Sequence, residues 1–233
     1  HEARLNITDF PIQFDDNYHI AFNVKDVIRV LAINEDQANR YLTAAFDGVS
    51  NFEIDNLPSQ ALDYSQLGNY DLIVTNDLQA ISSGLAFELQ QYVENGGNLT
   101  VFPGRDADLS SYRSFLSGFP ANELEQFQEQ PREVGQINTE AFVFNDVFEN
   151  RSANLKLPAT QGNFSLSNYA NRGEEPLLTY RDGAVLLARY QKGQGNLYLS
   201  AAPLNEAYSN LVRNGVQAAG SADQTAARPD AAL

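Results

Sequence analysis

Apolar residues recur with different periods in successive parts of the chain, and each period predicts a kind of element. Residues 3–24 alternate apolar and polar side chains around Asp15-Asp16-Asn17, as two antiparallel strands joined by a turn would. Val27 begins the apolar run VIRVLAI, which predicts a buried strand, and residues 34–47 then carry apolar side chains at helical spacing. We expect this helix to be capped by Asn34 and to stop at Gly48.

The segments that follow predict a parallel sheet. A short strand is expected near residues 52–54, and two buried strands at 70–77 and 98–102. A helix predicted at 85–94 lies between the last two, and Gly96-Gly97 turns the chain from this helix into the next strand. Parallel neighbours are joined by crossover helices, so this alternation is typical of βαβ units.

The second half has a different pattern. A short helix at 112–116 is followed by residues 119–139, whose polar character and two prolines predict an irregular excursion. Asp-Gly and spaced glycines supply the positive φ angles of tight turns. We expect a last helix at 205–213 and a disordered tail at 214–233. The β-rich segments between them are AFVFNDVF, NFSLSNY, PLLTY, AVLLARY and NLYLSAA, with turns at Arg181-Asp182-Gly183 and Lys192-Gly193-Gln194-Gly195.

These elements predict an α/β protein with a doubly wound sheet. A glycine-flanked strand followed by a helix resembles the flavodoxin-like sheet of class I glutamine amidotransferase-like domains, here with added antiparallel β hairpins and an N-terminal β extension. The expected domains are 1–24, the end of a β-sandwich or a sheet extension, and 25–213, the amidotransferase-like domain.

Composition narrows the classes of partner and chemistry. Thirty acidic and fifteen basic residues give a formal charge of −15, which disfavours nucleic acid as a partner because binding to phosphates requires basic side chains. No apolar run is long enough to span a membrane, and the start at His1-Glu2 without Met indicates a processed chain or a fragment. The absence of cysteine excludes a thiolate nucleophile or metal ligand.

Candidates for catalysis are few. The loop Phe102-Pro103-Gly104-Arg105 follows a strand at the position of the amidotransferase nucleophile, but it contains no cysteine. Ser110 and Ser111 lie nearby, yet the two histidines, His1 and His19, belong to the N-terminal hairpin, and a serine nucleophile needs a neighbouring base. The glycines do not form a phosphate-binding fingerprint. We therefore lean against an enzyme, and we assign no catalytic residue, no metal ligand and no cofactor.

Polar residues at the ends of the predicted parallel strands form the candidate binding surface, because the carboxyl ends of these strands meet at one edge of the sheet. One hypothesis is that the carboxylates converge on a hard cation. The favoured alternative is that residues such as Asn34, Asp77 and Asp108 cap helices and loops, and that Arg105 pairs with Asp106, Asp108 or Asp77. Ser82 to Gly84 would form a flexible rim. The candidates are Asn34, Asn76, Asp77, Arg105 and Asp106.

Several long segments, in order, resemble the C-terminal region of BatA-type aerotolerance membrane proteins from bacteria. They are NRYLTAAF, LDYSQLGNYDLIVTNDLQAISSGLAFELQQYVENGGNLTVFPG, INTEAFVFNDVF, GEEPLLTYRDG and GQGNLYLSAAPLNEAYSNLVRN. The resemblance implies that residues 1–24 end a β-sandwich and that residues 25–213 are a degenerate amidotransferase-like domain. It also implies a membrane-anchored parent protein with this domain on the extracytoplasmic (periplasmic) side of the inner membrane.

The leading hypothesis is therefore a non-catalytic interaction or scaffolding domain of a bacterial envelope protein, with a protein partner in the envelope. The alternative is a sensor of a small ligand or divalent cation at the carboxyl edge of the sheet. A hydrolase completed by another chain is a third hypothesis. A pocket with converging carboxylates would favour the sensor, and an apolar surface patch would favour the interaction domain. The sequence leaves the oligomeric state open.

Overall fold

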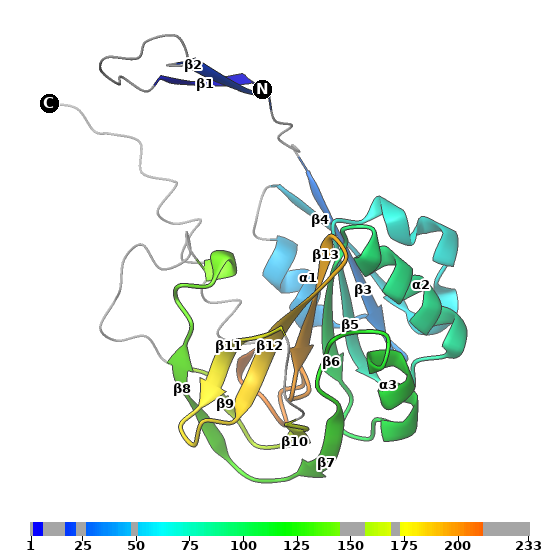
Figure 1. Cartoon of the computed structure of the whole chain (residues 1–233). Coiled ribbons are helices and arrows are strands. Elements are labelled where there is room, and N and C mark those ends of the chain that lie inside the picture. Colours follow the sequence, from blue (N-terminus) through cyan, green and yellow to red (C-terminus); the bar gives the residue numbers. More distant parts are fainter. Residues whose placement is uncertain are drawn as a thin grey trace, which may run out of the picture.

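A computed structural model describes residues 2–6, 17–21, 27–47, 51–144, 157–168 and 173–211. A nine-stranded sheet is its main feature, with the strand order β4-β3-β5-β6-β13-β12-β11-β8-β9 (Figure 1). The strands from β4 to β13 in this order are parallel, and the rest are antiparallel. The predicted α/β class with a large central sheet is confirmed.

Four strands of the parallel half come from the predicted βαβ region, whereas the fifth, β13, comes from the β-rich second half, where antiparallel or mixed strands were predicted. The strands of this half are β3 (Ile28–Asn34), β4 (Phe52–Pro58), β5 (Leu72–Leu78), β6 (Asn98–Pro103) and β13 (Gly195–Ser200). The connections hold α1 (Arg40–Asp47), η1 (Ser59–Ala61), η2 (Tyr64–Asn69), α2 (Ser83–Glu94) and α3 (Leu109–Leu116).

Three of the predicted helices form, but their starts differ from the prediction. Asn39, and not Asn34, caps α1: its Oδ1 accepts hydrogen bonds from the amides of Tyr41 (2.9 Å) and Leu42 (3.3 Å). Ser82 caps α2, and Asp108 caps α3. The prediction that Asn34 is a cap is wrong because its side chain is buried in the sheet edge, and the predicted stop at Gly48 lies outside the described residues.

The antiparallel half extends further than expected. Its strands are β8 (Arg132–Ile137), β9 (Ala159–Thr160), β11 (Glu174–Tyr180) and β12 (Val185–Lys192). Both predicted hairpin turns form, with Gly183 at φ 86° and Gly193 at φ 58°. The prediction of an irregular excursion at 119–139 is wrong, because β7 (Leu124–Gln128) and β8 lie within it and β8 joins the main sheet.

Two other expectations fail in this half. Residues 141–144 were expected in a strand, but Phe142–Phe144 form the short 3-10 helix η3. Residues 205–210, expected in a helix, form turns and a bridge between Ser209 and Thr160. The end of that helix and the predicted tail at 214–233 lie outside the described residues.

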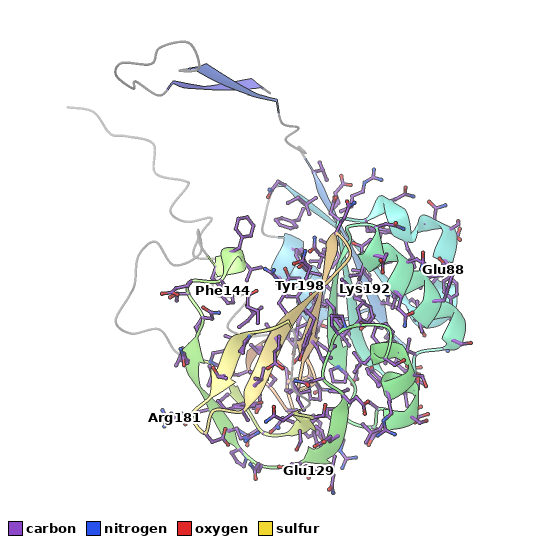
Figure 2. All side chains as sticks on the ribbon, viewed as in Figure 1. Glu88, Glu129, Phe144, Arg181, Lys192 and Tyr198 are labelled. Atoms are coloured by element: carbon purple, nitrogen blue, oxygen red, sulfur yellow. The ribbon has the colours of Figure 1, made fainter. Side chains whose placement is uncertain are left out.

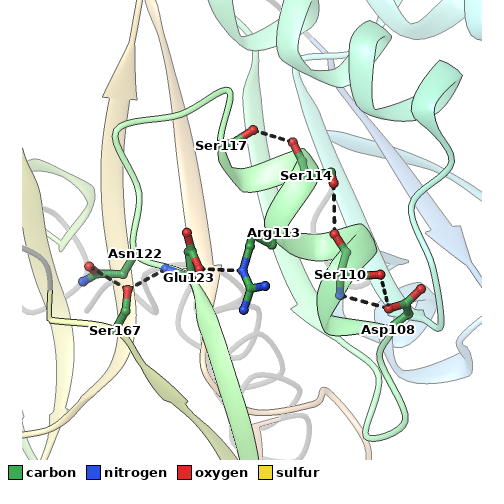
Figure 3. A network of polar contacts seen from close by, with 8 residues as sticks. All are labelled: Asp108, Ser110, Arg113, Ser114, Ser117, Asn122, Glu123 and Ser167. Atoms are coloured by element: carbon green, nitrogen blue, oxygen red, sulfur yellow. Dashed lines mark hydrogen bonds and ion pairs between the residues drawn. The ribbon is translucent and has the colours of Figure 1, made fainter.

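Two small sheets accompany the main one. The predicted N-terminal hairpin pairs β1 (Glu2–Asn6) with β2 (Asn17–Ala21). The strand β10 (Asn163–Leu166) pairs with β7, and polar contacts tie this sheet to α3 (Figure 3). Arg113 donates from Nε to Glu123 at 2.8 Å, and the Glu123 amide donates to Ser167 Oγ at 2.9 Å.

The two faces of the main sheet are covered unequally. Both α2 and α3 lie on one face, and α1 lies on the other (Figure 1). The strand residues under α2 and α3 are at most 1% exposed: Leu31, Ile33, Ile73, Leu99, Val101, Leu197 and Leu199. On the opposite face, Thr100, Phe102, Leu187 and Tyr198 are only half-buried. This is unusual for parallel strands, whose two faces are normally both covered.

Candidate functional site

The carboxyl edge of the parallel strands brings the predicted candidates close together. Asn34 ends β3, Asn76 and Asp77 lie near the end of β5, and Arg105 and Asp106 follow β6. The strand order reverses direction between β3 and β5, which is where ligands bind in many open α/β sheets. The prediction that these residues share one edge is confirmed.

Asn34 and Asn76 are hydrogen-bonded to each other. Asn76 Nδ2 donates to Asn34 Oδ1 at 3.0 Å, and Asn34 Nδ2 donates to Asn56 Oδ1 at 2.7 Å and to the Leu57 carbonyl at 3.2 Å. Asn56 Nδ2 in turn donates to the Asn39 carbonyl at 2.8 Å. These amides form a network at the point where the strand order reverses, and this network links α1, β3, β4 and β5.

Asp77 has an unusual backbone. Its φ of 60° makes it the one non-glycine residue in the described part of the chain with a positive φ. The exposed carboxyl group nevertheless loses solvation to the surrounding loops, and this raises the pKa of Asp77. The neighbouring carboxylates of Glu35, Asp106 and Asp36 raise it further.

These carboxylates do not make a cation site. Within the residues that the structure describes, no three His, Cys, Asp or Glu side chains are grouped so that they could hold a metal ion. Glu35 accepts the Gln79 amide at 2.9 Å, and Asp106 pairs with Arg105. The first of these contacts fastens the Glu35 loop to the segment after β5.

Arg105 is locally paired, as predicted, but one of its partners was missed. Its guanidinium contacts Asp106 and also donates from Nη2 to Glu129 at 2.8 Å. It lies over the Phe127 ring at 5.7 Å. Glu129 follows β7, which lies in the segment 119–139 that we predicted to be irregular. The sequence therefore contains no signal that Glu129 lies beside Arg105.

The remaining candidates of this edge have structural partners too. Ser82, which was expected in a flexible rim, accepts the Leu85 amide at 3.2 Å, and Ser83 and Gly84 begin α2. Ser111 Oγ donates to the Ile81 carbonyl at 2.8 Å, and Ser110 Oγ donates to Asp108 at 2.7 Å. Both serine hydroxyl groups therefore have local acceptors, a carbonyl for Ser111 and the helix-capping carboxylate of Asp108 for Ser110.

In the part of the chain that the structure describes, several cavities of about 310 to 730 Å³ are lined by residues other than these candidates. The largest lies on the half-buried face of the main sheet and holds about 730 Å³. A second, of about 310 Å³, lies between that face and α1. Leu72, Thr100 and Leu187 line both cavities, so together they form one depression, which we name the open-face groove.

Apolar side chains dominate the open-face groove. Phe144 of η3 and Tyr198 of β13 lie on it, on the side of the sheet away from Glu88 of α2 (Figure 2). Among the described residues, Phe142 at the rim of the groove is a large apolar side chain with 80% of its surface exposed. The part under α1 is lined by Tyr41, Leu42, Ala45, Phe46, Leu72, Val74, Phe102, Leu187, Leu204 and Leu211, with Thr100 and Ser200.

Sequence analysis missed this groove. Half-buried and buried positions alternate along β6, β12 and β13, and the sequence predicted these strands without assigning their faces. Phe102 and Tyr198 are on the less covered face, and alternation alone does not tell which face a helix covers.

Comparisons with known proteins identify no family. The sequence matches no protein-family model and no curated protein. Solved structures with a similar fold include cytoplasmic protein STM3548 from Salmonella typhimurium, at 15% identity and a TM-score of 0.64, covering 85% of this chain and 98% of that one.

Two further structures are also similar. Cytoplasmic protein STM1381 from Salmonella typhimurium LT2 has 15% identity and a TM-score of 0.60, over 77% of this chain and 89% of that one. A ThuA-like protein from Bacteroides uniformis has 13% identity and a TM-score of 0.57, over 85% and 92%. At these identities the likeness establishes the fold and no activity.

The names of these structures bear on the predicted location. We predicted the extracytoplasmic side of the inner membrane, whereas two of the similar structures are described as cytoplasmic proteins, which contradicts that prediction. None of the three is described as a BatA-type protein, and that resemblance stays a prediction. No helix in the described ranges has both the length and the apolar character of a membrane span.

Proposed function

We propose that this domain is a non-catalytic binding domain and that the open-face groove is its recognition surface. The observation that carries the proposal is the unequal cover of the sheet. Leu99 and Leu197 are fully buried under α2 and α3, whereas Thr100 and Tyr198, the next residues along the same strands, remain half-buried. A concave, mostly apolar surface with a few polar groups is the usual form of a ligand site.

The proposal keeps the predicted absence of catalysis but moves the site. The candidates at the carboxyl edge hold the structure together through mutual hydrogen bonds and ion pairs. We further propose that the fold is flavodoxin-like and belongs to the degenerate amidotransferase-like type, which the order β4-β3-β5-β6-β13 supports. An interaction or scaffolding role would then use the groove, with a partner that inserts an apolar group.

A fragment screen followed by NMR tests the proposal. ¹⁵N-labelled protein is titrated with a chemically diverse set of small compounds, and amide shifts are mapped onto the structure. We expect the hits to shift the amides of Thr100, Leu187 and Tyr198. Compounds that instead shift the amides around Asn34 and Asp77 would overturn the groove as the binding site and would favour a site at the carboxyl edge of the sheet.

Matched variants separate binding from loss of structure. Tyr198→Ala removes an aromatic ring from the groove, whereas Phe87→Ala removes one from α2, where the ring is 58% exposed. We expect the first to abolish the hits and the second to retain them. Turnover of ester, amide or phosphate substrates by the wild-type protein, absent from an Asp77→Ala variant, would refute the non-catalytic assignment.

A further inference from the structure

A row of facing residues crosses the open-face groove from a charged end to an apolar end. Arg189 of β12 faces Tyr198 of β13, Tyr198 faces Thr100 of β6, and Thr100 faces Val74 of β5. Residues in register on neighbouring strands point to the same side of a sheet. The charge of Arg189 therefore lies at one end of a path that leads over Tyr198 and Thr100 to the apolar space under α1.

The length of this path follows from the spacing of the strands. Three strand-to-strand steps separate Arg189 from Val74, which corresponds to about 14 Å at roughly 4.8 Å per step. Beyond Val74, Phe46 and Leu42 of α1 close the apolar end. The path fits an extended alkyl chain of about ten to twelve carbons, since C–C bonds are about 1.5 Å long and zigzag along the chain.

The charged end suits a carboxylate. Arg189 is the cation among the described residues that line the groove, and its side chain is 25% exposed. Its Nη1 contacts Glu175 at 3.1 Å, and a guanidinium offers five N–H donors for planar acceptors such as carboxylates. The Tyr198 hydroxyl, next to Arg189 in the sheet register, is protonated at neutral pH because the ordinary pKa of Tyr is about 10, and partial burial raises its pKa further.

Glu175, which pairs with Arg189 Nη1, also lies at this end, and a ligand carboxylate would bind the guanidinium donors other than Nη1. The second acidic side chain lies elsewhere. Asp71 directly precedes Leu72 of β5, three strands away from Arg189 of β12. It accepts a hydrogen bond from the Arg29 amide at 3.0 Å. The net charge of −15 repels anions at long range, but salt screens this repulsion beyond about 8 Å at physiological ionic strength. The local contact with Arg189 therefore decides which head group is preferred.

We propose that the open-face groove binds an amphiphilic carboxylate of the fatty-acid class. The carboxylate contacts Arg189 and Tyr198, and the alkyl chain crosses β13 and β6 to end under α1. This inference rests on the proposed function, because it names the ligand of the same groove. A neutral or cationic amphiphile would leave the donors of Arg189 and Tyr198 without an added acceptor.

Isothermal titration calorimetry with defined amphiphiles tests the inference. Octanoate, dodecanoate and hexadecanoate, each below its micelle concentration, vary the chain length, and dodecanol and dodecylamine vary the head group. We expect dodecanoate to bind most tightly of the three acids, and at least about tenfold more tightly than dodecanol or dodecylamine, a typical difference for a charge-assisted contact.

Three variants separate the two ends of the path. Arg189→Gln should weaken dodecanoate binding about tenfold and leave dodecanol binding unchanged, and Arg189→Lys should restore part of the loss. Thr100→Phe fills the middle of the path and should abolish binding of both compounds. Phe87→Ala, on the other face of the sheet, is the control, and circular dichroism with thermal unfolding verifies that each variant folds.

The outcomes distinguish this inference from the proposed function. All three head groups could bind equally well, with binding lost in Thr100→Phe but kept in Arg189→Gln. This result would overturn the preference for a carboxylate, while the groove would remain a binding site. Preference for dodecylamine would overturn it too. If no amphiphile binds but fragments or a protein segment shift Tyr198, the inference fails alone; if nothing binds at the groove, both proposals fail.

Discussion

The backbone of Gly104 lies directly against Asp77, so that a β-carbon at residue 104 would approach the Asp77 carbonyl oxygen to 2.9 Å and its Oδ1 to 3.1 Å. Gly104 follows β6 and Asp77 lies near the end of the neighbouring β5, where its φ is 60°. A side chain at residue 104 would therefore collide with the left-handed residue Asp77.

Gly104→Ala is expected to destabilise the fold by about 1–3 kcal/mol, the usual cost of forcing an extra carbon into a packed site. Urea denaturation followed by circular dichroism measures this change. A variant as stable as the wild type would show that the two loops adapt to the added carbon. The close contact between Gly104 and Asp77 would then not limit the residue at position 104.

Asp77→Asn is expected to stabilise the protein at neutral pH. The pKa of Asp77 is raised in the folded state, so the folded protein holds the proton to a higher pH than the unfolded chain does, and the wild type loses stability as the pH rises from the ordinary Asp value of about 3.9 through the raised value. Asparagine also tolerates a positive φ.

Denaturation of both proteins at several pH values measures the difference. The advantage of Asp77→Asn should be smallest in acid, where both forms are neutral, and constant above the raised pKa. Asp106→Asn serves as the comparison, because it removes a carboxylate that pairs with Arg105 and should not give the same gain. A pH-independent difference for Asp77→Asn would contradict the electrostatic cause.

Asn34→Ala is expected to cost more stability than Asn76→Ala. Asn34 makes hydrogen bonds with Asn56, Leu57 and Asn76, whereas Asn76 makes the one with Asn34, and its Oδ1 has no partner among the described residues. Leaving buried polar groups unpaired costs about 1–3 kcal/mol. Thermal and urea unfolding of the two variants check the order, and equal losses would contradict the central role of Asn34.

Gly195→Ala is expected to be among the most damaging small substitutions in the parallel half. A β-carbon at 195 would lie 2.2 Å from the Gly97 carbonyl oxygen and 2.3 Å from that of Val93, at the end of α2. We expect a loss of about 1–3 kcal/mol or more. Gly68→Ala, with nothing within 4 Å, should gain about 0.4–1 kcal/mol. Urea denaturation compares the two, and similar values would contradict the packing argument.

Local pattern was sufficient for most of the parallel half. The runs at 27–33, 70–77 and 98–102 correspond to β3, β5 and β6. A short run of apolar residues places apolar side chains on both faces of a strand, so it predicts a strand inside a sheet that is packed on both faces. The prediction failed at 119–139, since the strands β7 and β8 there are short, polar and stabilised by distant partners such as β11.

The candidate site shows the same division. Asn34, Asn76, Asp77, Arg105 and Asp106 were correctly placed at one edge, because parallel strands end together. Their engagement with Asn56 and Glu129 was not foreseeable, since those residues are contributed by other elements at 22 and 24 residues' separation.

The sequence by itself determined the α/β class, the alternation of strands and helices between residues 27 and 116, the tight turns and the acidic, cysteine-free composition, because periodicity, glycine placement and composition are local properties. That β13 joins the parallel strands was decided by the tertiary structure. Only the tertiary structure decided which face of the sheet is left half-buried and which polar residues satisfy one another. Alternation places Tyr198 and Leu197 on opposite faces, but whether a helix covers either face depends on where α1, α2 and α3 pack, and that is set by contacts between segments far apart in the chain.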